Sequence, residues 1–278
     1  MISPAVLPAQ PGLDVAVDLL RGRRLLALTG AGVSTDSGIP DYRGPTSVQR
    51  TPMTYAEFRS GAAARQRYWA RSHVGWQHLH RAEPNDGHRA LAAMERCGAV
   101  TALITQNVDG LHQAGGHRGV VDLHGRISLV MCLDCGARST RERLHERLSA
   151  ANAGFGQGFS PDVAPDGDAV VDGIDDFEIV GCEACGGVLK PDVVFFGENV
   201  PRERVELCYA LVDQAQGLLV AGSSLTVMSG LRFVRAAHRR GLPVVIVNRG
   251  TTRGDELATV HVDAGCSEAL GHLADAVG

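Results

Sequence analysis

Asn107, Asp109 and His124 are residues whose types and positions could bind a ligand and act on it in this chain of 278 residues. Asn107 and Asp109 stand two residues apart after an apolar run, and from a turn both side chains can reach one ligand. His124 lies at another expected strand end, and a neutral imidazole that titrates near physiological pH suits a general base. Each residue also has a plainer role, because Asn and Asp commonly cap turns and a lone histidine is more often a hydrogen-bonded core residue. The three residues alone leave both interpretations open.

The run from Gly30 to Gly44 places glycines, hydroxyls, an acid and an arginine directly after the apolar segment 25–29. Glycines at the carboxyl end of a buried parallel strand let main-chain N–H groups approach a pyrophosphate. A dehydrogenase fingerprint needs a third glycine where Thr35 stands, and an acid about twenty residues further on to hold a ribose. Both are missing. The run therefore predicts a dinucleotide loop and disfavours a hydride-transferring enzyme; the plainer alternative is a turn that only caps a helix.

Two Cys-x-x-Cys pairs, Cys132 with Cys135 and Cys182 with Cys185, are each followed by glycine and predict one tetrahedral zinc site. The segment between the pairs is longer than in an ordinary zinc ribbon, so the module must hold an inserted loop. Four thiolates leave no open coordination position, so the zinc ion would be structural and could not activate water. Seven cysteines, an odd count, suit a reducing compartment with metal better than a disulfide framework.

The elements that must position these residues alternate between strand-like and helix-like segments. Strands are expected at 25–29, 100–105, 193–196, 217–221 and 244–247, with a late strand at 260–263 and helical spacing at 231–240. This alternation predicts an α/β fold with a doubly wound, parallel, Rossmann-like sheet. Sites in such sheets lie at the carboxyl ends of the strands, where this chain carries polar, turn-forming residues at 30–32, 106–109, 222–224 and 248–250.

Two insertions interrupt the alternation. Residues 46–88 are predicted to form a helical module, and residues 132–187 a smaller zinc-binding module with an inserted acidic loop. The Rossmann-like, dinucleotide-binding domain would then comprise residues 1–45, 89–131 and 188–278.

Composition bounds the class of protein. With 44% hydrophobic and 21% charged residues the chain is a globular protein, which excludes disordered and fibrous classes. A net charge of -4 offers no basic footprint, so no direct nucleic-acid binding is expected. The apolar runs are too short for a membrane span, and residues 1–12 lack signal-peptide and transit-peptide features. We therefore expect a cytoplasmic protein without a membrane partner, and a monomer in preference to an oligomer.

Six motifs, taken in order, resemble those of the sirtuin family and span nearly the whole chain. They are Gly30–Arg43, with Tyr42 where most members carry Phe; Thr105–His112; Leu123-His124-Gly125; the two cysteine pairs; Lys190–Glu198; and Gly222–Leu225. Residues 67–71 and 74–76, together with 164–168, resemble the class II branch, which includes a vertebrate mitochondrial sirtuin. The chain is thus identified as a bacterial, class II member of this family.

The resemblance implies an NAD-dependent protein-lysine deacylase, which transfers the acyl group to ADP-ribose and releases nicotinamide. His124 would be the general base for a ribose hydroxyl, Asn107 would orient the nicotinamide ribose, and Ile39 with Asp109 would hold the carboxamide. The cofactor-binding residues implied are Gly30, Ala31, Gly32, Thr35, Ile39, Asp41, Tyr42, Arg43, Gln106, Asn107, Val108, Asp109, Gly222, Ser223, Ser224, Asn248, Arg249, Gly250 and Cys266.

The partner implied is an acyl-lysine protein or peptide. Val194, Phe195, Phe196, Gly197 and Glu198 would offer strand backbone to it, a β-addition mode, although the same apolar run could be only a core strand. By class resemblance we expect weak activity on acetyl and better activity on longer, branched or lipoyl-type acyl groups. Two alternatives stay open: a protein mono-ADP-ribosyltransferase, and a non-catalytic NAD-sensing module.

Two features bear on the acyl group. Tyr68 and Arg71 have a spacing similar to that used by another sirtuin class for acidic acyl chains, since a cation and a phenol can hold a carboxylate. The acidic segment 162–178 is expected to reach the acyl channel and shape selectivity; the plainer alternative is a solvated insertion.

Overall fold

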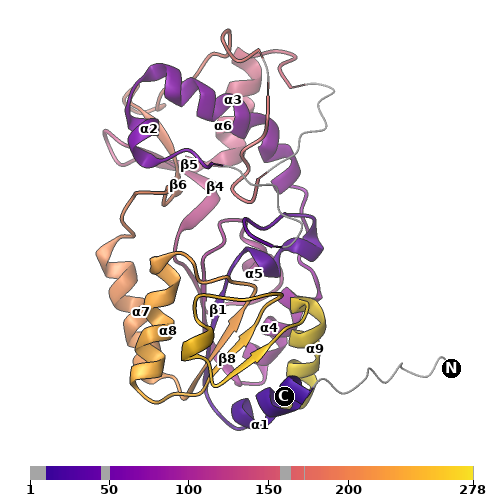
Figure 1. The fold of residues 1–278 in the computed structure, drawn as a ribbon. Coiled ribbons are helices and arrows are strands. Elements are labelled where there is room, and N and C mark those ends of the chain that lie inside the picture. The colour runs from indigo at the N-terminus through magenta and orange to yellow at the C-terminus, as the bar shows by residue number, and fades with distance from the viewer. Residues whose placement is uncertain (1–10, 45–50, 157–163, 172, 278) are drawn as a thin grey trace, which may run out of the picture.

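A computed structural model describes residues 11–44, 51–156, 164–171 and 173–277. Its larger sheet has six parallel strands, hydrogen-bonded in the order β3-β2-β1-β7-β8-β9 (Figure 1). The strands are β1 (Leu25–Thr29), β2 (Val100–Thr105), β3 (Val120–Asp122), β7 (Gly217–Ala221), β8 (Val244–Val247) and β9 (Val260–Val262). Strands β1, β7 and β8 are buried at every position, as expected where helices cover both faces of a parallel sheet. The predicted doubly wound α/β sheet is confirmed.

Helices cover the two faces of this sheet (Figure 1). One layer holds α1 (Pro11–Leu20), α4 (Asp86–Arg96) and α9 (Cys266–Val277), and the other holds α7 (Arg202–Gln214) and α8 (Met228–Arg239). Alternate residues of each strand point to opposite layers, so Leu25 packs in the core with α1, α4 and α9, and Leu26 packs in the core with α7 and α8. The order of strands reverses direction at β1, with β2 on one side and β7 on the other. Such a switch point leaves a crevice at the carboxyl ends of the strands.

A smaller unit lies beyond that end of the sheet (Figure 1). It contains an antiparallel sheet, ordered β5-β4-β6, made of β4 (Gly125–Cys132), β5 (Arg138–Thr140) and β6 (Leu189–Val193). Around it lie α2 (Tyr55–Arg59), α3 (Ala62–Leu79) and α6 (Arg141–Ala151). Phe58, Trp69, Val130 and Leu144 belong to one apolar cluster, so the helical insertion and the cysteine-bearing segment share a core. The domain boundaries given above stay a prediction, of which residues 1–10, 45–50, 157–163, 172 and 278 lie outside the described residues.

The strand expected at 193–196 is wrong in both extent and sheet. β6 is Leu189–Val193 and pairs antiparallel with β4 rather than joining the parallel sheet. The reason is local. The Phe195 N–H donates to Glu198 Oε2 at 2.9 Å and the Glu198 N–H donates to the Phe195 carbonyl, so the backbone turns at residues 195–198 and the strand is not continued. Lys190 Nζ donates to the Val193 carbonyl at the end of the strand.

The remaining elements are short. They are α5 (Leu111–Ala114) and the 3-10 helices η1 (Ala31–Val33), η2 (Thr35–Ser37) and η3 (Asp255–Leu257). Within the ranges that the structure describes, no helix combines the length and apolar character needed to cross a bilayer.

Candidate active site

A cavity of about 560 Å³ opens at the carboxyl ends of the parallel strands, between the two units. Its walls come from the loops after β1, β2, β7 and β8, from His124, and from the segment that follows β6. The structure brings all but two of the predicted cofactor and substrate residues to this cavity. The exceptions are Thr35, whose hydroxyl donates to the Gly32 carbonyl at 3.1 Å, and Cys266, which starts α9 and is buried in the sheet core. Burial raises the pKa of the Cys266 thiol to about 12.

Three glycines let the loops after β1 and β7 touch. A Cβ atom at Gly32 would lie 2.9 Å from Gly222 Cα, and one at Gly222, whose φ is +61°, would lie 2.3 Å from Val33 N. The N–H groups of Gly30 and Gly32, expected to face a pyrophosphate, donate to the carbonyls of Ala221 and Gly222 at 3.1 and 2.8 Å. These glycines therefore bring two backbones together, and their contact with a cofactor stays a prediction. Beside them, Arg43 and Arg249 supply positive charge to the cavity wall, which suits an anionic dinucleotide.

Ser34 joins Asn107 to Asp109. Asn107 Nδ2 donates to Ser34 Oγ at 3.1 Å and to the Gly30 carbonyl at 3.0 Å, and Ser34 Oγ donates to Asp109 Oδ2 at 2.7 Å. The Leu111 N–H donates to the other carboxylate oxygen at 2.9 Å. The structure thus holds both predicted side chains on one polar network. Ser34 itself is a site residue that we did not identify from the sequence, although it lies inside the glycine-rich run as a hydroxyl residue.

The environment of Asp109 shifts the pKa of its carboxyl group in opposite directions. Burial raises the pKa of this carboxyl, whereas the hydrogen bonds from the Leu111 N–H and from Ser34 lower it. Because those donors point at both oxygens, the carboxylate can orient a bound amide without rotating.

Both ring nitrogens of His124 are engaged. Nδ1 lies 2.8 Å from the carbonyl oxygen of Gln106, which can only accept, so Nδ1 carries the proton of the neutral ring. Nε2 is then the acceptor, and Ser229 Oγ donates to it at 2.8 Å. Burial lowers the pKa of His124, Arg204 acts in the same direction, and the hydrogen bond to Gln106 opposes them. The ring therefore stays neutral and able to take a proton at neutral pH. Ser229 was not identified from the sequence, because an isolated serine in a helical segment carries no pattern.

The predicted substrate segment, residues 194–198, contains a turn at 195–198 that a buried ion pair anchors. Lys190 Nζ lies 3.0 Å from Glu198 Oε2, and the lysine side chain is only 3% exposed. The lysine also lies over the rings of Tyr55 and Phe195, at 5.7 and 5.1 Å from their centroids. The ion pair fixes the backbone that leaves β6 for the cavity wall.

The part of the cavity around Tyr68 is closed by residues of the smaller unit. Asp166 and Asp168 line the cavity, and Tyr42 hydrogen-bonds with Asp166. Burial raises the pKa of Asp166 and that of Tyr42. Arg71 Nη2 pairs with Asp168 Oδ2 at 2.7 Å, and Arg71 Nε donates to the Ala169 carbonyl. A carboxylate of the chain thus pairs with Arg71, which argues against the possibility that Tyr68 and Arg71 together hold an acyl carboxylate.

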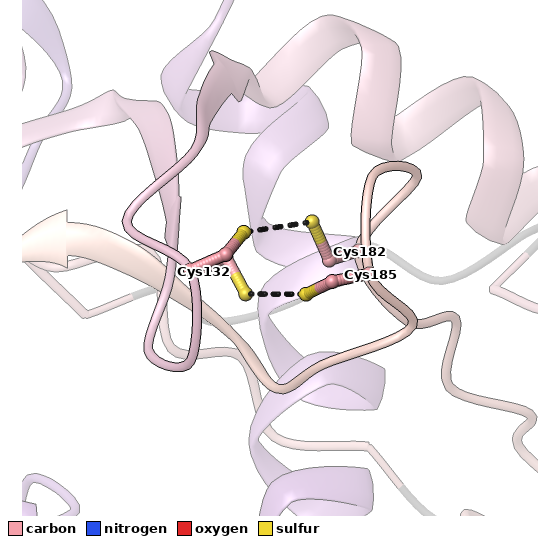
Figure 2. A group of neighbouring side chains, drawn as sticks. Cys132, Cys182 and Cys185 are labelled. Atoms are coloured by element: carbon pink, nitrogen blue, oxygen red, sulfur yellow. Dashed lines mark hydrogen bonds between the residues drawn. The ribbon is translucent and has the colours of Figure 1, made fainter.

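The four predicted metal ligands converge (Figure 2). Cys132 Sγ lies 3.6 Å from Cys185 Sγ, Cys135 Sγ lies 3.8 Å from Cys182 Sγ, and all four sulfurs are within 4.8 Å of one another. Tetrahedral zinc with Zn–S bonds of ~2.3 Å separates its sulfurs by ~3.8 Å, so the donor set fits one zinc ion. Cys132 is the last residue of β4, Cys135 lies in the loop before β5, and Cys182 and Cys185 lie in the segment before β6. With four thiolates the ion would be structural.

Comparisons with known proteins agree with this geometry. The model of the Sir2 family matches residues 30–229. NAD-dependent protein deacetylase 1 of Mycobacterium avium (strain 104) is 57% identical over 265 residues, covering 93% of this chain and 93% of that protein. A protein of the same name from Streptomyces coelicolor is 55% identical over 275 residues, covering 98% and 92%. A solved structure described as "Sir2-p53 peptide-NAD+" has a TM-score of 0.76 at 32% identity and covers 95% of this chain and 97% of that one.

Proposed function

The chain belongs to the Sir2 family, and from that premise we propose how its cavity performs the NAD-dependent deacetylation of protein lysines. It is a sirtuin enzyme that uses NAD and acts on acyl-lysine peptides. NAD, when bound, supplies the ribose that receives the acyl group and the nicotinamide that leaves. The loops after β1, β7 and β8 would hold the phosphates and the adenosine half, with Arg43 and Arg249 near the negative charge.

The observation that carries the mechanism is the state of His124. Its Nδ1 proton is donated to the Gln106 carbonyl, which leaves Nε2 as the basic nitrogen of a residue that lines the cavity. We propose that, once nicotinamide has left the ribose, Nε2 takes the proton of a ribose hydroxyl, so that this oxygen accepts the acyl group while the amide bond breaks and the lysine amine is released. Asn107 and Asp109, fixed through Ser34, would orient the ribose and the carboxamide. A binding module would not need a base at that position.

The peptide is proposed to lie along residues 194–198, with the acyl-lysine side chain entering between Phe195 and Phe196. Tyr42 and Phe196 have ring centroids 5.9 Å apart, and Tyr68 and Phe195 have centroids 5.2 Å apart, so aromatic faces surround the entrance. The support for this mode is that residues 194–198 line the cavity beside these aromatic rings. One of the similar structures is described as "Structure of Sir2Tm bound to a propionylated peptide", at 30% identity and a TM-score of 0.75.

We expect the protein to form nicotinamide and O-acyl-ADP-ribose in equal amounts when it receives NAD and an acetyl-lysine peptide. Mass spectrometry of the products tests this, with the unacylated peptide as the control. Transfer of label from NAD to protein in the absence of an acyl peptide would instead favour a mono-ADP-ribosyltransferase. Binding of NAD without nicotinamide release on any acyl peptide would favour an NAD-sensing module.

Acyl preference is the finer part of the proposal. Neutral acyl groups longer than acetyl, including branched and lipoyl-type groups, are favoured, because the aromatic wall offers apolar contact while Asp166 and Asp168 line the same cavity. A negatively charged acyl end would meet these carboxyl groups and find Arg71 paired. The acidic insertion thus shapes selectivity through residues 164–168; residues 157–163 and 172 lie outside the described part.

A panel of acyl-lysine peptides tests this preference. We expect a higher kcat/KM for neutral branched or lipoyl groups than for acetyl, and the lowest value for succinyl. Asp168→Asn should raise the succinyl-to-acetyl ratio of kcat/KM about fivefold to tenfold, since it removes one negative charge next to Arg71. Asp176→Asn, which removes an exposed charge from the same segment, is the matched control and should leave the ratio unchanged. An unchanged ratio in both variants would contradict the assignment.

We also propose that the protein acts in the cytoplasm as a monomer and does not bind nucleic acid directly. The support is the net charge of -4. Light scattering at several concentrations would test the oligomeric state.

A further inference from the structure

Ser229 lines the cavity, and its side-chain hydroxyl forms a hydrogen bond outside its own helix. It is the second residue of α8 (Met228–Arg239), a helix whose N-cap residue, Val227, has no capping side chain. The Ser229 hydroxyl donates to His124 Nε2, and the distance between the two atoms is 2.8 Å. The direction of this bond follows from the other nitrogen, because the Gln106 carbonyl requires the proton on Nδ1.

The two hydrogen bonds of His124 come from segments that pack on each other. Gln106 supplies the carbonyl for Nδ1, and its side chain lies against Gly230, the residue after Ser229. A Cβ atom at Gly230 would lie 2.6 Å from Gln106 Oε1 and 2.8 Å from Gln106 Cδ, so a larger residue there would displace the Gln106 side chain. Gln106 Nε2 in turn donates to Ser223 Oγ at 2.8 Å. The start of α8 thus packs on Gln106, and the Ser229 hydroxyl reaches the imidazole from there.

We propose that Ser229 is a positioning residue for His124, which holds Nε2 as a hydrogen-bond acceptor facing the cavity until a substrate hydroxyl takes the place of the serine. With both nitrogens engaged, the ring has one tautomer and one orientation. A rotation of the ring by 180° about the Cβ–Cγ bond would place carbon atoms where the two nitrogens stand, and both hydrogen bonds would be lost. The serine hydroxyl can rotate away without moving the helix, so the base is released when another hydroxyl donates to it.

This inference rests on the proposed role of His124, and its test separates the two. The first measurement is the imidazole ¹⁵N spectrum of the protein without NAD, with the signals of His124 assigned by comparison with His124→Ala. We expect Nδ1 to be protonated, and we expect Ser229→Ala to move the Nε2 resonance toward that of an imidazole nitrogen without a donor. Ser229→Thr, which keeps the hydroxyl, should restore the position. An Nε2 resonance that does not change in Ser229→Ala would overturn the proposal.

The second measurement separates positioning from folding. In the proposed reaction nicotinamide leaves before His124 takes the ribose proton, so exchange of labelled nicotinamide into NAD reports the earlier step. Ser229→Ala should lower the rate of O-acyl-ADP-ribose formation about twofold to tenfold, the range for one hydrogen bond, with exchange and the KM for NAD unchanged. Ser229→Thr should recover most of that loss. Equal losses in exchange and in product formation would show a merely structural role and would overturn the proposal. A shifted Nε2 signal in a protein that releases no nicotinamide would count against the proposed function instead.

Discussion

His124→Ala should lower O-acyl-ADP-ribose formation by a factor of about 10² to 10⁴, the range for loss of a general base. Nicotinamide exchange and NAD binding should persist, because Asn107, Ser34 and Asp109 form their hydrogen-bond network without the imidazole. The measurement is the rate of product formation at saturating acyl peptide, with NAD affinity from calorimetry. His272→Ala, at an exposed position of α9, is the control and should retain full activity. Turnover of His124→Ala at the wild-type rate would remove the imidazole from the mechanism.

The dependence of activity on pH should reflect the protonation state of His124. A base must be neutral to act, and burial lowers the pKa of His124 below the ordinary value of 6.5. Activity should therefore be complete at neutral pH and decline only as the pH falls through that lowered pKa. A half-maximal point above 6.5 would contradict the environment that the structure gives to this ring.

Cys132→Ser or Cys185→Ser should release the zinc ion and unfold the smaller unit. Structural zinc contributes about 10 kcal/mol or more of binding free energy at neutral pH, which is comparable to the whole stability of a typical domain. The measurements are the zinc content of the purified protein, expected to fall from one ion per chain to nearly none, and a lower melting temperature. Cys97→Ser, at an exposed cysteine, should change neither value. A variant that lacks Cys132 and still carries a full complement of zinc would refute the tetrahedral site.

Loss of zinc should also abolish activity, although the ion would do no chemistry. β4 runs from the residue after His124 to Cys132, and β6 leads from the second cysteine pair to the substrate segment. The cysteine cluster thus lies at one end of β4 and β6, and the cavity lies at the other end of these strands. Chelation of the zinc should therefore disturb the aromatic entrance, and we expect restoration of zinc to recover activity only if the unit refolds.

The features of this molecule that could be predicted are those that a short stretch of sequence specifies by itself. Buried parallel strands are continuous apolar runs, so the extents of β1, β2, β7 and β8 follow from the sequence. Paired cysteines and polar strand ends are equally local signals, and parallel topology brings those ends to one edge. The cavity therefore assembles where the sequence places it.

The remainder depends on contacts between distant residues. Arg71 looks available for a ligand until the fold brings Asp168 to it, and the apolar run at 193–196 looks like a strand until Glu198 accepts the hydrogen bond that turns it. Ser34 and Ser229 are ordinary serines in the sequence, and only their distances to Asp109 and His124 give them a role. Hydroxyl groups can bond almost anywhere, so their partners are set by tertiary structure.

The ion pair between Lys190 and Glu198 has one further consequence. Lys190 is the only lysine of the chain, and its side chain is buried in that ion pair. The other side chains that stay positively charged at neutral pH are arginines. The folded enzyme thus presents no exposed ε-amino group. Its own surface cannot carry the modification that it removes, and in a mixture with a protein substrate, amine-reactive reagents would leave its side chains unlabelled and mark the lysines of the substrate.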